Sequence, residues 1–185
     1  MLEEHDLIAG CKREETGARK ELYERYAATM LSLCMRYIGD RDIARDVLQD
    51  GFYQVFTKIG EYSGTGSFEG WMKRIFINTA IRQLQKKRFL PMISEYEDSI
   101  EDTGTSAFEK LSTDDLHHCI AELPDGFRTV FNLYAVEGYS HTEIAKMFHI
   151  KEVTSRSQYM HARRILQKKV QQFILQEDAR KYRPV

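Results

Sequence analysis

The sequence has few of the residues that break helices or build special sites. Of its 185 residues, 3 are proline and 3 are cysteine. Pro91 and Pro124 stand between helical patterns, where a proline interrupts no helix. Cys11, Cys34 and Cys119 are scattered and form no Cys-x-x-Cys pair. This spacing argues against a zinc or redox site and indicates reduced thiols that fill a core.

The sequence also has no apolar run close to the roughly 20 residues that a membrane helix needs. Its first ten residues, MLEEHDLIAG, are acidic and contain no long apolar core of a secretory signal. A hydrophobic fraction of 42% with 30% charged residues is typical of a globular protein. We therefore expect a soluble, cytoplasmic protein without membrane insertion.

The chain has almost no net charge, −1, but its charges are segregated. Residues 94–115 carry eight acids and one lysine, whereas residues 82–88 and 163–169 are basic blocks. Phosphate binding depends on the local patch and not on the total charge. A net charge near zero therefore does not exclude nucleic-acid binding.

Helical periodicity dominates and no segment alternates as a strand does. We predict an all-α chain with two small helical domains, residues 1–90 and 113–185, joined by an acidic flexible linker, residues 91–112. The expected helices are Glu4–Cys11, Ala18–Tyr37, Asp42–Gly60, Phe68–Arg88, Thr113–Glu122, Pro124–Glu137, His141–Phe148 and Glu152–Gln176.

The helix expected over Asp42–Gly60 has a complete apolar stripe, which includes Phe52, and Asp40 is well placed to cap the start of this helix. Its opposite face carries Asp46, Gln49, Asp50 and Tyr53. Exposed acids usually serve solubility, but tyrosine is enriched at protein interfaces. The face is therefore either a solvated surface or a docking surface.

The fourth expected helix carries a basic and polar stripe, with Arg74, Asn78, Arg82 and Lys86 at four-residue spacing. A Gly/Ser-rich loop, residues 62–67, precedes it. Cations that hold phosphates beside aromatic rings such as Trp71 suit a single strand with unstacked bases. The alternative is an ordinary solvated amphipathic helix.

The second domain has the pattern of a helix-turn-helix. Ser140 caps one short helix, Ala145 is small enough for a close helix crossing, and a turn lies near residues 149–151. The next helix opens with polar residues at 154–158, which can reach base edges in a major groove. A plain helical hairpin is the alternative.

Taken together, these motifs resemble bacterial RNA polymerase sigma factors of the compact extracytoplasmic-function group. The resemblance runs from about residue 6 to 168. It rests on these strings: Tyr23-x-x-Tyr26; Arg36-Tyr37-x-Gly39-Asp40; Ala44-Arg45-Asp46-Val47-Leu48-Gln49-Asp50-Gly51-Phe52; Phe68-x-Gly70-Trp71-Met72-x-Arg74-Ile75-x-x-Asn78; Leu123-Pro124-x-x-x-Arg128-x-Val130-Phe131; Glu137-Gly138-Tyr139-Ser140; Glu143-Ile144-Ala145; Ala162-Arg163-x-x-Leu166.

The resemblance implies a sigma factor that directs core polymerase to promoters, helps to open them and is controlled by an anti-sigma protein. It implies a monomer when free, contacts with the clamp and flap regions of polymerase, and binding to duplex and melted promoter DNA. The residues expected to bind the clamp are Asp46, Gln49, Asp50, Phe52 and Tyr53. Those expected at the start-proximal element are Tyr62, Ser67, Phe68, Trp71, Lys73, Arg74, Asn78, Arg82, Lys86 and Arg88. Those expected at the distal element are Thr142, Thr154, Ser155, Arg156, Ser157, Gln158, His161 and Arg163.

Three residues in the turn depart from the family pattern. His149, Lys151 and Val153 stand where Gly, Ser and Gly are usual, and histidine tolerates a left-handed turn position better than most residues. Gln158 and His161 stand where arginine is frequent, so the promoter sequence that is read can differ.

The alternative functions are an enzyme and a dimeric repressor. An enzyme would need convergent chemistry, and no nucleophile elbow, phosphate loop or His-Glu-x-x-His motif occurs, so we expect no catalytic residues, cofactor or metal. The pairs Asp114/His117 and Asp115/His118 have helical metal-site spacing, but a di-metal bundle draws such pairs from several helices. A dimeric repressor would explain the helix-turn-helix but not the residue 46–52 string.

Overall fold

The structure is a computed structural model that describes residues 2–86 and 113–181, with the side chains of residues 113, 114, 117 and 176–181 outside that description. The chain divides into two compact units, residues 1–89 and 90–185. The described residues contain helices and no strand, as the periodicity predicts. The predicted linker, residues 91–112, lies outside the described residues.

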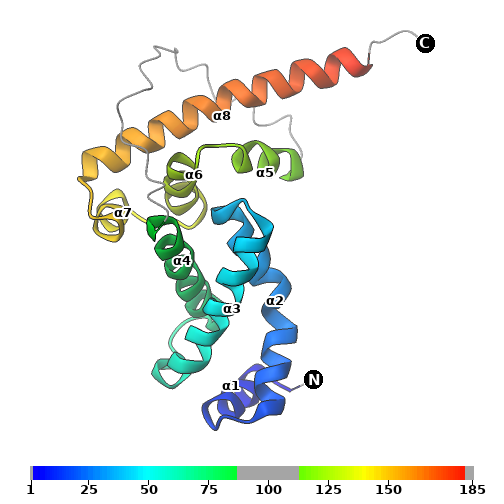
Figure 1. The fold of residues 1–185 in the computed structure, drawn as a ribbon, viewed down its shortest axis with the longest axis vertical. Helices are drawn as coiled ribbons and strands as arrows, with labels where there is room; N and C mark the ends of the chain where they lie inside the picture. The colour runs from blue at the N-terminus through cyan, green and yellow to red at the C-terminus, as the bar shows by residue number, and fades with distance from the viewer. Residues whose placement is uncertain (1, 87–112, 182–185) are drawn as a thin grey trace. The chain divides into compact units, whose positions relative to one another are not determined.

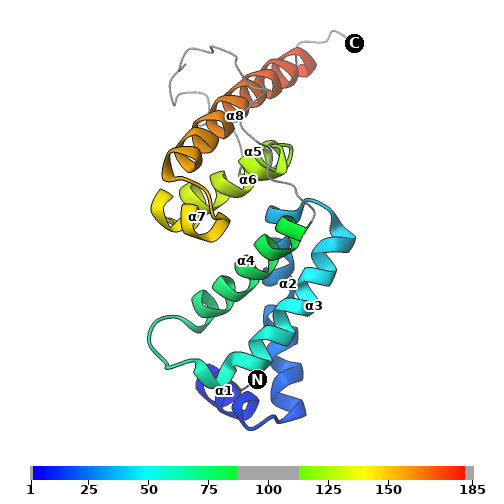
Figure 2. The ribbon, with the colours of Figure 1, turned by 60° about the vertical axis from the view of Figure 1, so that its left-hand side comes forward.

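The first unit is a helical bundle in which α2, α3 and α4 pack side by side and α1 lies against the start of α2 (Figure 1; Figure 2). Its elements are α1 (Glu4–Lys12), α2 (Thr16–Ile38), α3 (Arg41–Lys58), the 3-10 turn η1 (Ile59–Glu61) and α4 (Phe68–Lys86).

Local capping explains where these helices begin and end. Gly39 ends α2 in the left-handed conformation, with φ of 75°, and its N–H donates to the carbonyl of Met35. Asp40 then caps α3, because its Oδ1 accepts the N–H groups of Asp42 and Ile43 at 3.0 Å each. Helix α4 begins in the same way, because Ser67 Oγ accepts the Gly70 N–H at 3.0 Å.

Large apolar side chains from all three long helices meet in the core of the first unit. Phe52 of α3 lies edge-on to Phe76 of α4, with ring centroids 5.2 Å apart, and 4.7 Å from the ring of Tyr23 on α2, which is 42% exposed at the edge of this core. Burying one side chain of this size contributes about 1.5–3 kcal/mol. The α3–α4 contact is close because Gly51 faces the Phe76 ring.

The second unit contains α5 (Thr113–Ala121), α6 (Asp125–Phe131), the π-helical segment η4 (Asn132–Val136), α7 (His141–Phe148) and α8 (Glu152–Lys181). Its core joins α5, α6 and α8 through Cys119, Ile120, Leu123, Phe127, Ala162, Leu166 and Val170. The helix expected over Pro124–Glu137 is therefore two segments, α6 and η4.

Arg128, part of the motif after Pro124, is buried and joins α5 to α6. Its Nη1 donates to the carbonyls of Ala121 at 2.6 Å and Leu123 at 3.1 Å, and its Nη2 pairs with Asp125. Ala121 is the last residue of α5, where a carbonyl has no partner within the helix, and Leu123 lies in the turn that follows. The motif thus holds the corner between two helices.

The turn between α7 and α8 forms as the sequence predicts. Ser140 and Glu143 make a reciprocal capping box at the start of α7. His149 ends α7 in the left-handed conformation, with φ of 55° and ψ of 39°. The histidine therefore takes the position where family members usually have glycine, and α8 begins at Glu152.

Replacing Gly51 with alanine should destabilise the first unit, because the new Cβ would come closer than 3.0 Å to three carbons of the Phe76 ring. Overpacking of this kind costs about 1–3 kcal/mol. Gly17→Ala is the matched control: its Cβ meets nothing within 4 Å, and alanine favours a helix. Thermal unfolding followed by the fluorescence of Trp71 measures both. Equal midpoints for the two variants would contradict the packing.

Candidate nucleic-acid interface

The polar face of α3 is exposed as predicted, with one correction. Asp46, Gln49, Asp50 and Tyr53 are exposed, and Tyr53 retains 69% of its accessible surface. Periodicity places Phe52 in the buried stripe, and it is only 3% exposed and packs in the aromatic core, so the clamp contact that the resemblance implies for Phe52 is corrected. A ring in that position holds the helix and is closed to a partner.

The loop before α4 is shaped by contacts of Tyr62. Its hydroxyl donates to the carbonyl of Gly66 at 2.8 Å, and its own carbonyl accepts from Lys12 Nζ at 2.9 Å. Gly64 and Gly66 have φ of 81° and 78°, a conformation that side chains other than glycine rarely take. The loop is therefore closed on itself and tied to α1.

The aromatic residues expected to stack on bases are mostly packed on one another. Phe68 is 1% exposed and Tyr62 is 9% exposed, so neither ring is open to a base, contrary to the prediction. Trp71 is half-buried and stacks on Phe68, with centroids 5.6 Å apart and planes 19° apart. The rings form a platform, and Trp71 forms its accessible edge.

The basic stripe on α4 is exposed over its described length. Arg74, Asn78, Arg82 and Lys86 are all exposed, which agrees with the four-residue spacing. Lys73 is half-buried and pairs with Glu69 at 2.8 Å, so its charge is partly offset. The predicted contact Arg88 lies outside the described residues.

The first turns of α8 expose only part of the predicted set. Thr154, Arg156 and Ser157 are exposed or half-buried, but Ser155 and Gln158 are buried, at 0% and 3% exposed. The buried pair continues with Ala162 and Leu166 at three-and-four spacing, so it belongs to the inner face of the helix. Ser155 and Gln158 therefore face the inside of the second unit and not the exposed side of α8.

The other residues expected at the distal element differ in their surroundings. Thr142, on α7, is exposed, and Arg163, on α8, is half-buried. His161 is also half-buried and stacks on Phe127, with centroids 5.8 Å apart. Only part of the His161 ring is therefore left for DNA.

The exposed stripe of α8 includes two apolar residues that the sequence interpretation did not select. Val153 and Met160 are 73% and 40% exposed, and they lie three residues before and four after Arg156. Apolar side chains on a recognition helix can contact the methyl group of thymine. The three-and-four spacing from Arg156 was the signal that could have found them.

Glu152 is a third residue that the sequence interpretation missed. Its carboxylate accepts from Thr142 at 2.8 Å and from Arg156 Nε at 3.1 Å, so it joins two residues expected to contact DNA. Glu152 and Arg156 are four residues apart in the sequence, and this spacing on a helix predicts an ion pair between them.

A buried histidine lies where α7 crosses α8. His141 stacks on Tyr134, with centroids 4.1 Å apart, and its Nδ1 lies 3.0 Å from Ser155 Oγ. Burial lowers the pKa of His141 below 6.5, the positive charge of Arg156 lowers this pKa further, and Glu152 partly offsets the shift. The neutral ring is thus the form that fits this crossing.

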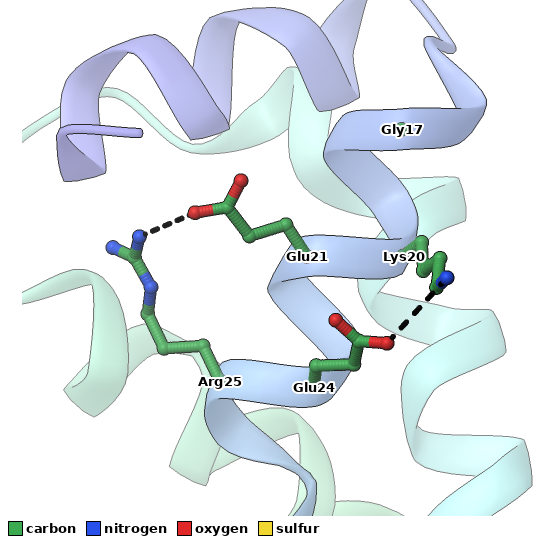
Figure 3. A pocket seen from close by; sticks show the side chains of 5 residues that line it. All are labelled: Gly17, Lys20, Glu21, Glu24 and Arg25. Carbon is green, nitrogen blue, oxygen red and sulfur yellow. Dashed lines mark hydrogen bonds and ion pairs between the residues drawn. The ribbon is translucent and has the colours of Figure 1, made fainter. Parts of the chain in front are cut away.

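A hollow on the surface of α2 is lined by Gly17, Lys20, Glu21, Glu24 and Arg25 (Figure 3). Arg25 pairs with Glu21 at 2.9 Å and Lys20 with Glu24 at 3.8 Å. Because these charges are paired with each other, the hollow is a poor candidate for a ligand site.

The metal-site pairs receive no support from the described residues. Within them, no group of three or more His, Cys, Asp or Glu side chains is placed to hold a metal ion. His118 instead pairs with Glu122 at 3.3 Å, and the side chains of Asp114 and His117 lie outside the description. In the same part of the chain, no helix has the length and apolar character needed to cross a membrane.

Two family models match the chain in order. Sigma-70 region 2 matches residues 22–90, and Sigma-70, region 4 matches residues 113–166. The chain belongs to the sigma-70 family. A dimeric repressor would account for the helix-turn-helix in region 4, but it would not account for the match to region 2.

Similar curated proteins include sigma factors of about the same length. RNA polymerase sigma-H factor of Pseudomonas aeruginosa is 28% identical over 91% of this chain and 94% of its own. The ECF RNA polymerase sigma-E factors of Haemophilus influenzae and Escherichia coli K12 are each 27% identical, over 92% and 94% of this chain and 97% of their own. The chain is therefore a sigma factor of the extracytoplasmic-function (ECF) group.

Two solved structures are also similar. One is titled "Structure of CnrH in complex with the cytosolic domain of CnrY", and the other is the sigma factor RpoE with the anti-sigma factor NepR from Bartonella quintana. Each has 19% identity and a TM-score of 0.48, over 89% and 80% of this chain and 95% and 94% of the respective solved chain.

As a member of this family, the chain directs core RNA polymerase to promoters and takes part in opening them. Region 2 contains the α3 face, the loop and α4, and region 4 contains α7 and the start of α8. Helix α1 lies outside both matches, yet its Lys12 holds the loop of region 2. The loop of region 2 is thus held in part by a residue that precedes region 2 in the chain.

The low pKa of His141 predicts how region 4 responds to acid. An unfolded histidine titrates near 6.5 and the folded one below it, so the unfolded state binds the proton first as the pH falls. The contribution of neutral His141 to the stability of region 4 is therefore fully present above about pH 6.5. It is lost as the pH falls through the pKa of the folded state.

An NMR titration of the His141 ring in the full chain measures this pKa. Arg156→Gln should raise the midpoint and Glu152→Gln should lower it, because the charges at these two residues act in opposite directions. A wild-type midpoint above 6.5 would contradict the burial.

Proposed function

We propose that three exposed surfaces divide the work of this sigma factor. The α3 face, Asp46, Gln49, Asp50 and Tyr53, binds the polymerase clamp. The main support is that these four side chains are exposed, while α3 packs through the aromatic residues on its other side. Folding therefore does not require this set of polar residues. Region 4 is proposed to contact the flap.

The loop at residues 62–67 and α4 are proposed to hold the melted strand. The stripe Arg74, Asn78, Arg82 and Lys86 would follow its phosphates, and Trp71 would offer the edge of the ring platform to an unstacked base. Ser67 would act through its cap on α4, and Phe68 and Tyr62 would act by supporting Trp71, which both rings contact.

The start of α8 is proposed to read the distal element as duplex. Arg156 and Ser157 lie in its first two turns, where side chains reach base edges in the major groove. Thr142, Thr154, His161 and Arg163 would add contacts around them. The acidic stretch 91–112 would act as the linker between the two regions.

The protein is proposed to be a regulated binder and not an enzyme, working in the cytoplasm with polymerase. An anti-sigma protein would hold it inactive, and the free protein would be a monomer. Support comes from membership of the ECF group and from the match to both DNA- and polymerase-binding regions.

Charge reversal on the α3 face tests the polymerase contact. Asp46→Lys with Asp50→Lys should weaken copurification with core polymerase by roughly 30-fold or more, because cations would replace two proposed partner contacts. The matched control is Asp6→Lys with Glu61→Lys, which reverses two exposed acids elsewhere in the first unit. Both should keep the helical signal of the wild type. Undiminished copurification by the first variant would refute the assignment.

Loosening the loop tests promoter opening. Tyr62→Phe keeps the ring but loses the hydroxyl bond to Gly66, worth about 0.5–1.5 kcal/mol. Permanganate reactivity of thymines in the bubble should fall by roughly 2- to 10-fold, while closed-complex binding in a gel shift is unchanged. Tyr26→Phe is the control, since it loses a hydroxyl bond to Glu4 in the same unit. Normal reactivity for Tyr62→Phe would argue against this role for the loop.

A further inference from the structure

The first residue of α8 is a glutamate that bridges both helices of the helix-turn-helix. One oxygen of Glu152 accepts from Arg156 Nε at 3.1 Å and Nη2 at 2.5 Å, and the other accepts from Thr142 Oγ1 at 2.8 Å. These hydrogen bonds, from Arg156 first and Thr142 second, lower the pKa of Glu152 below its usual value. Glu152 is therefore an anion at neutral pH, and α7 and α8 are joined through it.

The bridge decides which edge of the Arg156 guanidinium is available. A guanidinium has a side edge, formed by Nε and one terminal nitrogen, and an end edge, formed by both terminal nitrogens. Glu152 occupies the side edge through Nε and Nη2. The end edge remains for a second acceptor, and paired donors of this kind match the O6 and N7 atoms of guanine.

Glu152 also offsets the charge of an exposed cation. The Arg156 side chain keeps 61% of its accessible surface, so without Glu152 it could turn toward any nearby phosphate. A phosphate contact carries no sequence information, whereas a base contact does. An anion beside Arg156 also repels the DNA backbone and so lowers binding that is independent of sequence.

We propose that Glu152 is a positioning residue that commits Arg156 to reading a base. The inference rests on the proposed role of α8 at the distal promoter element and adds a specificity residue to it. Glu152 would lower total affinity and raise discrimination, which is the opposite of what a residue needed only for folding would do.

A promoter-library selection with the full chain and core polymerase, at two salt concentrations, tests this. Arg156→Ala should lower the preference for the correct base at one position by about tenfold. Glu152→Ala should lower the same preference by roughly threefold or more and make binding steeper in salt by about one unit. Glu152→Gln keeps an acceptor oxygen, so it should retain the base preference while the salt dependence rises. A ratio of base preferences is insensitive to the folded fraction, so reduced stability of a variant cannot imitate the result.

Two further variants complete the design. Glu122→Ala removes an equal charge from the pair with Lys169 elsewhere in region 4 and should leave the base preference unchanged. In the Arg156→Ala background, Glu152→Ala should have no further effect on preference, because the two residues act as one unit.

The outcomes separate the two levels of inference. If Arg156→Ala flattens the preference and Glu152→Ala does not, the positioning role alone is wrong. If Arg156→Ala changes all promoters equally, the proposed reading role of Arg156 fails, and the role of Glu152 fails with it. An equal loss of preference in Glu122→Ala would also overturn the proposal, since a general charge effect would then explain the result.

Discussion

The close approach of α3 and α4 is the constraint on which the first unit depends. Gly51 has no side chain, so the Phe76 ring lies directly against the α3 backbone and contacts Phe52 at the same point. A helix can bury only one face against such a neighbour, so the opposite faces must point outward. The acidic face of α3 and the basic stripe of α4 are therefore oriented by the same apolar contact, although neither takes part in it.

The second unit uses polar contacts where the first uses aromatic packing. His141 bonds Ser155 inside the crossing of α7 and α8, and Glu152 bonds Thr142 and Arg156 at its rim. Polar bonds have directional geometry, so they specify how the two helices are oriented more narrowly than apolar packing does. The proposed reading of a base needs Arg156 to be held in one position within a groove. A narrowly specified orientation of α7 and α8 is therefore useful at this crossing. The cost is that the buried histidine must remain neutral.

The charge distribution explains how a nearly neutral chain can bind both a protein and DNA. Acids gather on the α3 face, and exposed cations gather on α4. At the start of α8, Glu152 offsets Arg156, so the electrostatic attraction to DNA there is weaker than a count of arginines suggests. Such an arrangement favours discrimination over affinity, which suits a protein that is proposed to reach promoters together with polymerase.

Sequence patterns alone were enough to predict the all-α class, the caps at Asp40 and Ser140, the family, and most helix bounds to within two residues; the exceptions are the segment after Pro124 and the end of α8. These features depend on local spacing and capping, which neighbouring residues decide. Periodicity placed Phe52 in the buried stripe, but it did not determine whether Phe68, Ser155 and Gln158 face inward: these three were expected at interfaces and are buried. Their type fits either side of a helix, and only packing against a second helix selects one. The partners of Lys12 and Glu152 were likewise decided by the tertiary structure, because Tyr62 and Thr142 reach them only after the chain folds back.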